Sequence, residues 1–120
     1  MNKQLNIFHA YDIRGKYPGE INENIVFDIS QRIAKYLKSK ILHRKIKIIV
    51  GCDARLSSPN LYQAVIKGII SNESKTNTRK KFIIHKAGIM TTPMFYFFAD
   101  YFNTDFGIMI TASHNPKEYN

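Results

Sequence analysis

Apolar side chains recur every three or four positions between Ile21 and Leu42, which is the spacing of one face of an α-helix. Asn22 and Asn24 stand near the start of this stripe, and asparagine is a common N-cap residue. The pattern therefore predicts a helix that buries one face and is capped by one of these two asparagines.

Two further helices are predicted where apolar residues follow a hydroxyl residue and a proline. "SSPNLYQAVIKGII" offers Ser58 as the N-cap and Pro59 at the first helical position. "TTPMFYFFADYF" offers Thr92 and Pro93 in the same roles, and its apolar residues lie on nearly every side. We expect this second helix to be packed deep between a sheet and a neighbouring element, with its aromatic rings in the core.

Short apolar runs between these helices predict three strands, at residues 46–51, 82–85 and 105–111. The first of them, "IKIIVG", is β-branched with little alternation, which is typical of a strand covered on both faces. Helices and strands then alternate along the chain, an order that favours right-handed crossovers. The sequence predicts one α/β domain over residues 1–120, with three layers (α/β/α) and a mainly parallel sheet.

Composition and charge exclude some of the classes to which the protein could belong. None of the apolar runs has the roughly 20 residues of a membrane-spanning helix, and the N-terminus has no secretory signal pattern. Cys52 is the single cysteine, so the chain cannot form an internal disulfide, and a single thiol suits a reducing compartment. We therefore expect a cytoplasmic protein without membrane partners. The chain carries 18 Lys and Arg against 9 Asp and Glu, a net charge of +9 that suits an anionic partner. Nucleic acid is a disfavoured choice, because neither a recognition motif nor an exposed stacking platform is evident.

Chemistry-bearing residues follow two of the predicted strands, in "CDARLSSP" and "TASHNP". In a parallel sheet these strand ends open on the same side, where ligands bind. Ser113 and His114 are adjacent, however, and adjacent side chains of an extended segment point to opposite faces, which argues against His114 as the base for Ser113. The G-x-S-x-G elbow of the α/β-hydrolases is also missing. Taken alone, this pattern favours a plain turn over a nucleophile or phosphate carrier.

Metal ligation has little support from the residues alone. The four histidines show no i, i+3 or i, i+4 pairing, and the aspartates are dispersed along the chain. Arg14, in "YDIRG", is a candidate phosphate clamp or an ordinary surface charge. Arg55 is a weaker candidate for the site, and a salt bridge with Asp53 that shapes its loop is an alternative with at least equal support.

Three stretches nevertheless match one family in the right order: "AYDIRGKYPGEI", "VGCDARLSSPNLYQAVIKGI" and "GIMTTPMFYFFADYFNTDFGIMITASHNPKEYN". Together they resemble the N-terminal domain of the α-D-phosphohexomutases, in the bacterial phosphomannomutase/phosphoglucomutase branch. The resemblance implies that Ser113 is a phosphoserine that exchanges its phosphoryl group with hexose 1-phosphate and hexose 6-phosphate through a bisphosphate intermediate.

The same resemblance assigns roles to further residues. It implies that His114 and Asn115 shape the loop around Ser113, and that Tyr11 and Arg14 reach the cleft and hold the phosphoserine and the substrate. It also implies Mg²⁺ as cofactor, bound through the Ser113 phosphate, and a hexose 1,6-bisphosphate as activator.

Members of this family are several times longer and contain four domains. The resemblance therefore implies that these residues are a truncated first domain, incomplete at its C-terminus, whose partners are a phosphosugar substrate and the remaining mutase domains. The chain by itself is expected to be inactive. Two other hypotheses stay open: a basic α/β module that binds nucleic acid or another polyanion, and a gene remnant without function.

Overall fold

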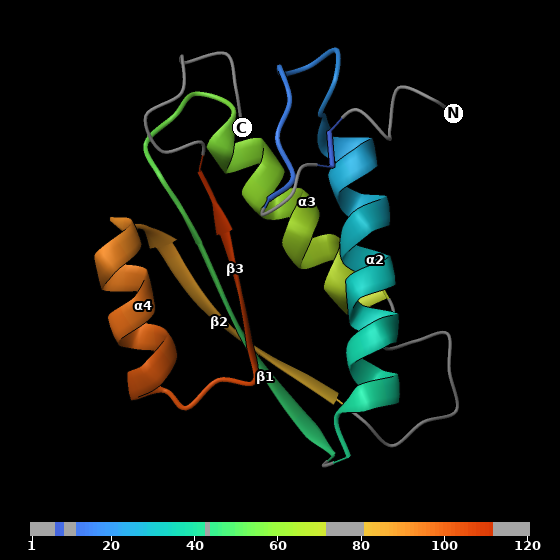
Figure 1. Cartoon of the computed structure of the whole chain (residues 1–120), viewed down its shortest axis with the longest axis vertical. Helices are drawn as coiled ribbons and strands as arrows, with labels where there is room; N and C mark the ends of the chain where they lie inside the picture. Colours follow the sequence, from blue (N-terminus) through green and yellow to red (C-terminus); the bar gives the residue numbers. More distant parts are fainter. Residues whose placement is uncertain (1–6, 9–11, 43, 72–80, 112–120) are drawn as a thin grey trace.

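The computed structural model describes residues 7–8, 12–42, 44–71 and 81–111. Its centre is a sheet of three strands, β1 (Lys45–Cys52), β2 (Lys81–Ile89) and β3 (Phe106–Ile110). The strand order is β2-β1-β3, and β1 pairs in parallel with both neighbours. The predicted parallel sheet is confirmed, and the carboxyl ends of all three strands lie at one end of the domain (Figure 1).

The burial of the central strand β1 on both faces explains why its sequence shows little alternation of apolar and polar residues. Ile46, Ile48, Ile49 and Val50 are all fully buried, because helices cover both faces of β1. From Ile48 onward the side chains on both faces of the strand are therefore apolar, whereas Lys45 and Lys47 lie at its less buried start. Strand β1 is one residue longer than predicted at each end, β2 is one residue longer at its start and four at its end, and β3 is one residue shorter at each end.

Helices α2 (Glu23–Lys40) and α3 (Ser58–Ser71) lie on one side of the sheet, with α3 against the strands and α2 against α3 (Figure 1). Asn22 caps α2, because its side chain accepts a hydrogen bond from the Ile25 amide at 3.1 Å. The two helices approach closely at Gly68, where an added Cβ would lie 2.6 Å from the Phe27 carbonyl oxygen. This glycine lets the helix backbones come together.

Both predicted serine and threonine caps are wrong by one residue. Helix α3 begins at Ser58 itself, and its first turn is closed by the Leu61 amide donating to the Ser57 carbonyl at 3.2 Å. Helix α4 (Thr92–Tyr101) is capped by Thr91, whose hydroxyl accepts from the Met94 amide at 3.3 Å. Each motif has two adjacent hydroxyl residues, and in each the first stands at the cap position.

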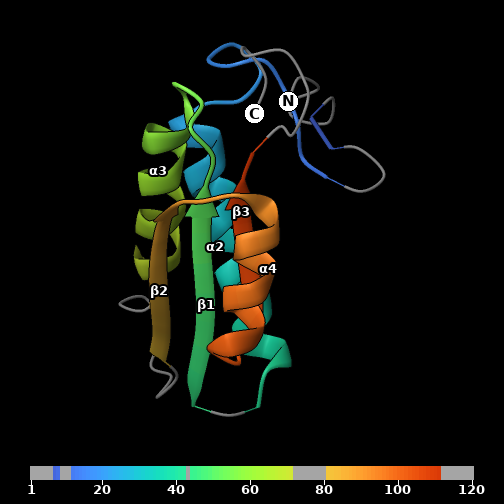
Figure 2. The ribbon, with the colours of Figure 1, turned by 90° about the vertical axis from the view of Figure 1, so that its left-hand side faces the viewer.

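Within the described part of the chain, α4 is the one helix on the opposite face of the sheet, and it completes the three-layer α/β/α arrangement (Figure 2). Phe95 is the buried residue of this helix, whereas Tyr96, Phe97 and Tyr101 are 62–70% exposed. The expectation that α4 is packed deep in the core is therefore wrong for the described residues. Phe95 faces the strands, and the described chain supplies little cover for the other sides of α4.

Among the described residues, none of the helices is both long enough and apolar enough to cross a membrane.

Candidate functional site

The candidate site lies where β1 and β3 end side by side. Asp53 directly follows β1, and Thr111 directly follows β3. The Asp53 amide donates to the Ile110 carbonyl oxygen at 3.0 Å, so the pairing of the two strands continues one step beyond β1. The parallel arrangement thus brings the two predicted chemical loops to the same edge of the sheet, as expected for this class of fold.

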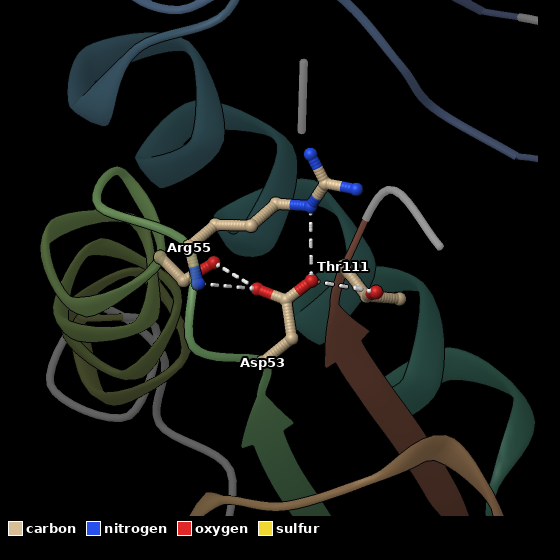
Figure 3. A network of polar contacts seen from close by, with 4 residues as sticks. Asp53, Arg55 and Thr111 are labelled. Carbon is tan, nitrogen blue, oxygen red and sulfur yellow. Dashed lines mark hydrogen bonds and ion pairs between the residues drawn. The ribbon is translucent and has the colours of Figure 1, made fainter. Parts of the chain in front are cut away.

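The carboxylate of Asp53 is the centre of a polar network at this edge (Figure 3). It accepts hydrogen bonds from the Thr111 hydroxyl at 2.8 Å and from the Ser58 hydroxyl at 2.7 Å. The Arg55 amide and the Arg55 Nε atom each donate to it at 3.1 Å. One side chain therefore joins the end of β3, the loop after β1 and the start of α3.

Asp53 is ionised in this network. Its burial opposes ionisation, but the hydrogen bonds from Ser58, Arg55 and Thr111, together with the charge of Arg55, outweigh that effect and hold the Asp53 pKa below its usual value. The Arg55 and Asp53 side chains are only 13% and 22% exposed, so solvent screens their ion pair less than it screens a surface pair. The predicted Asp53–Arg55 salt bridge is confirmed.

This network fixes the starting point of the segment that contains the candidate serine. Thr111 is the last described residue, and the 112–120 segment begins immediately after it. Because the Thr111 hydroxyl is bound to Asp53 and its neighbour Ile110 is bound to the Asp53 amide, the chain leaves β3 from a defined position.

The segment that contains Arg14 lies at the same end of the domain (Figure 2). The Arg14 amide donates to the Ile7 carbonyl oxygen at 2.8 Å, and Phe8 and Ile13 form an antiparallel bridge. Further along, the Tyr17 hydroxyl donates to the Glu23 carboxylate at the start of α2, which raises the Tyr17 pKa and lowers the Glu23 pKa. This loop is thereby attached to the first turn of a helix.

The structure describes one of the five residues predicted for the site. Arg14 is half-buried and belongs to the 12–21 segment. The other four lie outside the described residues: Tyr11, Ser113, His114 and Asn115.

The sequence analysis did not identify Ser58 and Thr111 as hydrogen-bond donors to Asp53. It places Ser58 at a helix cap and Thr111 at the end of a strand. A signal was present, because each is a hydroxyl residue placed just beyond one of two strands that were predicted to end at the same edge. A carboxylate at that edge needs hydrogen-bond donors, and these hydroxyls are close enough to supply them.

The described residues do not themselves form a metal centre. No group of three His, Cys, Asp or Glu side chains lies together within the described part of the chain. Cys52 is buried, and its burial, with the adjacent charge of Asp53, raises the pKa of the thiol, so it is a poor nucleophile. An open hollow of about 500 Å³ lies between Tyr96 and Phe106, at the amino end of β3 and hence away from the candidate site.

Comparison with known proteins gives one consistent result. The family profile for phosphoglucomutase/phosphomannomutase, alpha/beta/alpha domain I, matches residues 5–120. A phosphomannomutase from Vibrio cholerae is 36% identical over 118 residues, which cover 98% of this chain and 24% of that protein. A phosphomannomutase from Klebsiella pneumoniae is 37% identical over 117 residues, covering 98% of this chain and 66% of that sequence.

Comparison with solved structures points to the same family. The crystal structure of a phosphoglucomutase/phosphomannomutase family protein from Burkholderia thailandensis superposes with a TM-score of 0.70 at 25% identity. That match covers 95% of this chain and 24% of the other. The chain thus spans about a quarter of the length of the Vibrio and Burkholderia proteins.

Proposed function

Because this chain belongs to the phosphoglucomutase/phosphomannomutase family, as its α/β/α domain I, we propose that it is the phosphoserine-carrying part of a phosphohexomutase. The proposed reaction interconverts the 1-phosphate and the 6-phosphate of a hexose, glucose or mannose. Ser113 is the proposed carrier of the phosphoryl group.

The proposed chemistry consists of two transfers in opposite directions. In the first, a hydroxyl oxygen of the sugar monophosphate bonds to the phosphorus on Ser113, and the bond between phosphorus and the serine Oγ breaks. The sugar hydroxyl loses a proton and Oγ gains one, so a hexose 1,6-bisphosphate and a free serine result. In the second, Oγ takes the phosphoryl group from the other position of the sugar, which regenerates phosphoserine and releases the isomeric monophosphate. Hexose 1,6-bisphosphate also activates the unphosphorylated enzyme by the second transfer.

Four neighbouring residues have proposed supporting roles. Arg14 binds phosphate oxygens, because a guanidinium offers several N–H donors in one plane and keeps its charge. Tyr11 helps to hold the substrate, and His114 and Asn115 shape the loop around Ser113. Mg²⁺ is proposed to bind the Ser113 phosphate, where it would neutralise charge, with its other ligands outside this chain. The described residues form no group of three metal-ligating side chains by themselves.

The observation that carries the proposal is the hydrogen bond between the Thr111 hydroxyl and Asp53. A group that transfers phosphate must be held within a fraction of an ångström of its acceptor, since the transfer depends on positioning. Thr111 precedes Ser113 by two residues, so the Asp53 network holds the chain at a point just before the proposed carrier. The network also links Thr111 to the start of α3, a rigid element.

Turnover is proposed to require more than this chain. The Vibrio and Burkholderia proteins are about four times as long as this chain, and the substrate-binding and metal-binding parts of the reaction are proposed to belong to the remaining mutase domains. The 120 residues alone are therefore proposed to be inactive.

A chimera tests the proposed function. Residues 5–120 would replace the matching region of the Vibrio cholerae phosphomannomutase, and conversion of mannose 1-phosphate and glucose 1-phosphate would be assayed with Mg²⁺. We expect activity in the chimera and its loss in Ser113→Ala, by at least about a thousandfold since the covalent carrier is removed. Ser39→Ala is the matched control, because Ser39 is an exposed serine at the end of α2.

Circular dichroism and thermal unfolding would show that each variant is folded. A folded chimera with Ser113→Ala that retains the activity of its parent would contradict the proposal, as would a folded chimera without activity on either sugar phosphate.

A further inference from the structure

Positive charge is concentrated around the amino ends of β1 and β2. Between Arg32 and Lys47 the sequence has seven Lys and Arg residues and no Asp or Glu. This stretch comprises the second half of α2, the connection that follows it and the start of β1. Both views of the ribbon place the end of α2 and the starts of β1 and β2 at the same end of the domain (Figures 1 and 2).

The pairing of the strands brings these charges together and adds another. Lys45 of β1 is the register partner of Lys81 of β2, and the Lys81 amide donates to the Arg44 carbonyl oxygen at 2.8 Å. The Lys38 ammonium lies 5.6 Å from the centroid of the Phe82 ring, so the last turns of α2 lie beside the start of β2. We name the surface formed by five exposed residues the basic end: Lys40, Leu42, Arg44, Lys45 and Lys81.

Few carboxylates are available to neutralise the basic end. Within the described part of the chain, no carboxylate forms an ion pair with any of its four cations. Asp100 lies in the last turn of α4, and Asp105, before β3, accepts a hydrogen bond from the Lys47 amide at 2.8 Å, so these two offset part of the charge. The 72–80 segment, outside the described residues, has three Lys and Arg residues and one Glu in its sequence. Its charge therefore adds to that of the basic end.

Leu42 is an apolar side chain among these cations. It lies in the connection between α2 and β1, two residues after Lys40 and two before Arg44, and it is 90% exposed. This combination suits the surface of an anionic membrane, where an apolar side chain enters the acyl boundary while Lys and Arg meet the headgroups. Tyr36, 60% exposed and 5.8 Å from the Lys40 ammonium, adds an amphipathic ring of the kind found at membrane interfaces.

These observations favour a membrane over the other anionic or covering partners. A nucleic acid would attract the same cations, but its phosphates offer Leu42 nothing apolar to contact, and the sequence has no nucleic-acid recognition motif. The remaining mutase domains are proposed to complete the site at the carboxyl ends of the strands. The basic end lies at the opposite end of the domain, away from the place where they are needed (Figure 1).

We infer that the basic end is a docking surface for an anionic membrane, on which its four cations contact lipid headgroups and Leu42 enters the acyl boundary. The expectation of no membrane partner rested on the lack of a long apolar run, and peripheral docking does not need one. A domain docked in this way turns the ends of β1 and β3, and hence the candidate site, away from the bilayer (Figure 1). The inference holds whether or not Ser113 carries phosphate.

Cosedimentation of the chain with lipid vesicles tests this inference. The vesicles would contain phosphatidylcholine alone or phosphatidylcholine with about 30% phosphatidylglycerol, which gives them a negative surface potential. We expect binding to the anionic vesicles alone in about 0.05 M NaCl and its loss in about 0.5 M NaCl, because salt screens the attraction. Lys45→Glu should weaken binding at least tenfold, because each Lys or Arg near the surface strengthens it about fivefold and the reversal changes two charges.

Lys86→Glu is the matched control for Lys45→Glu. Lys86 is an exposed lysine in the second half of β2, so both variants have the same net charge but Lys86→Glu leaves the basic end unchanged. We expect Lys86→Glu to bind anionic vesicles nearly as tightly as the unmodified chain does. Equal weakening by the two variants would overturn the inference, because net charge alone would then drive binding.

A fluorescence measurement tests the apolar contact and covers the case in which a charge variant does not fold. The chain has no tryptophan, so Leu42→Trp places a single indole at the basic end. We expect its emission to shift to shorter wavelength when anionic vesicles are added, because the indole leaves water. Leu56→Trp is the matched control, since Leu56 is 95% exposed in the loop after β1, at the other end of the domain, and its emission should not shift.

Four outcomes would each overturn the inference. These are no binding to anionic vesicles at low salt, equal binding to uncharged vesicles, and an emission of Leu42→Trp that does not shift. The fourth is tighter binding to a DNA duplex of about 20 base pairs than to the anionic vesicles, which would assign the basic end to a nucleic acid instead.

Discussion

Helices α3 and α4 cover opposite faces of the same sheet, but they are integrated to very different degrees. Most residues of α3 are buried, because α3 is held between the strands and α2. In α4 Phe95 alone is buried, and the helix rests on the glycines of two strands. In α3 an apolar stripe beside polar residues indicates which side of the helix is buried. In α4 the residues are apolar on nearly every side, and such a pattern does not indicate which side the sheet covers.

The largest expected effect separates the inner and outer sides of α4. Phe95→Ala should lower the free energy of unfolding by about 3 kcal/mol, because it removes a buried ring from its contacts with β1 and β3. Phe97→Ala should change it by less than about 0.5 kcal/mol, because that ring is mostly exposed. Urea unfolding at low protein concentration would measure both. Similar losses for the two variants would mean that α4 is buried on both sides.

A second comparison concerns the glycines that allow close contact on each face. Gly68→Ala should destabilise the domain by about 2 kcal/mol, because the new Cβ would meet the backbone of α2, which cannot move aside easily. Gly107→Ala should cost about 1 kcal/mol, because its Cβ would meet side-chain atoms of Phe95 and Ile49 rather than backbone atoms. Thermal unfolding of the pair would show the order. A greater loss for Gly107→Ala would contradict the idea that α4 is the looser helix.

The last stability effect concerns the candidate site, and it depends on pH. Asp53→Asn should cost about 1 kcal/mol near neutral pH, because the amide keeps some hydrogen bonds but loses the ion pair with Arg55. The pKa of Asp53 is lower in the folded than in the unfolded chain, so its contribution is fully present above the usual aspartate pKa of about 4 and is lost as pH falls through the folded value.

The difference in unfolding free energy between wild type and Asp53→Asn should therefore be constant above about pH 5 and shrink below about pH 4. Urea unfolding at several pH values would measure it. A difference that grows as the pH falls would show that the Asp53 pKa is raised in the folded chain, against the account of the network.

Much of the fold could be predicted from the sequence, because its periodic patterns report local burial. The stripe of α2 and the β1 strand appear in the structure as predicted, and of the two candidate caps, Asn22 and Asn24, Asn22 is the one that caps α2. Cap positions were wrong by one residue, since Ser57–Ser58 and Thr91–Thr92 each offer two equivalent hydroxyls. The burial of α4 could not be predicted, because a helix that is apolar all round contains no information about which neighbours cover it.

The site was predictable in part for a similar reason. Local rules gave the Asp53–Arg55 pair, since the two residues are close in sequence. They did not give the contact between Asp53 and Thr111, which are 58 positions apart and meet only because β1 and β3 are adjacent. The role of Ser113 came from neither spacing nor composition but from resemblance to a family, and it stays a prediction.

The location of the phosphoryl group tests that central prediction most directly. The chimera with the Vibrio cholerae phosphomannomutase would be incubated with glucose 1,6-bisphosphate and Mg²⁺, and peptide fragmentation by mass spectrometry would locate the added phosphate. We predict one phosphoryl group on Ser113 and none in Ser113→Ala. A catalytically active chimera whose phosphate lies on another residue, such as Ser57 or Ser58, or which carries none, would contradict the account.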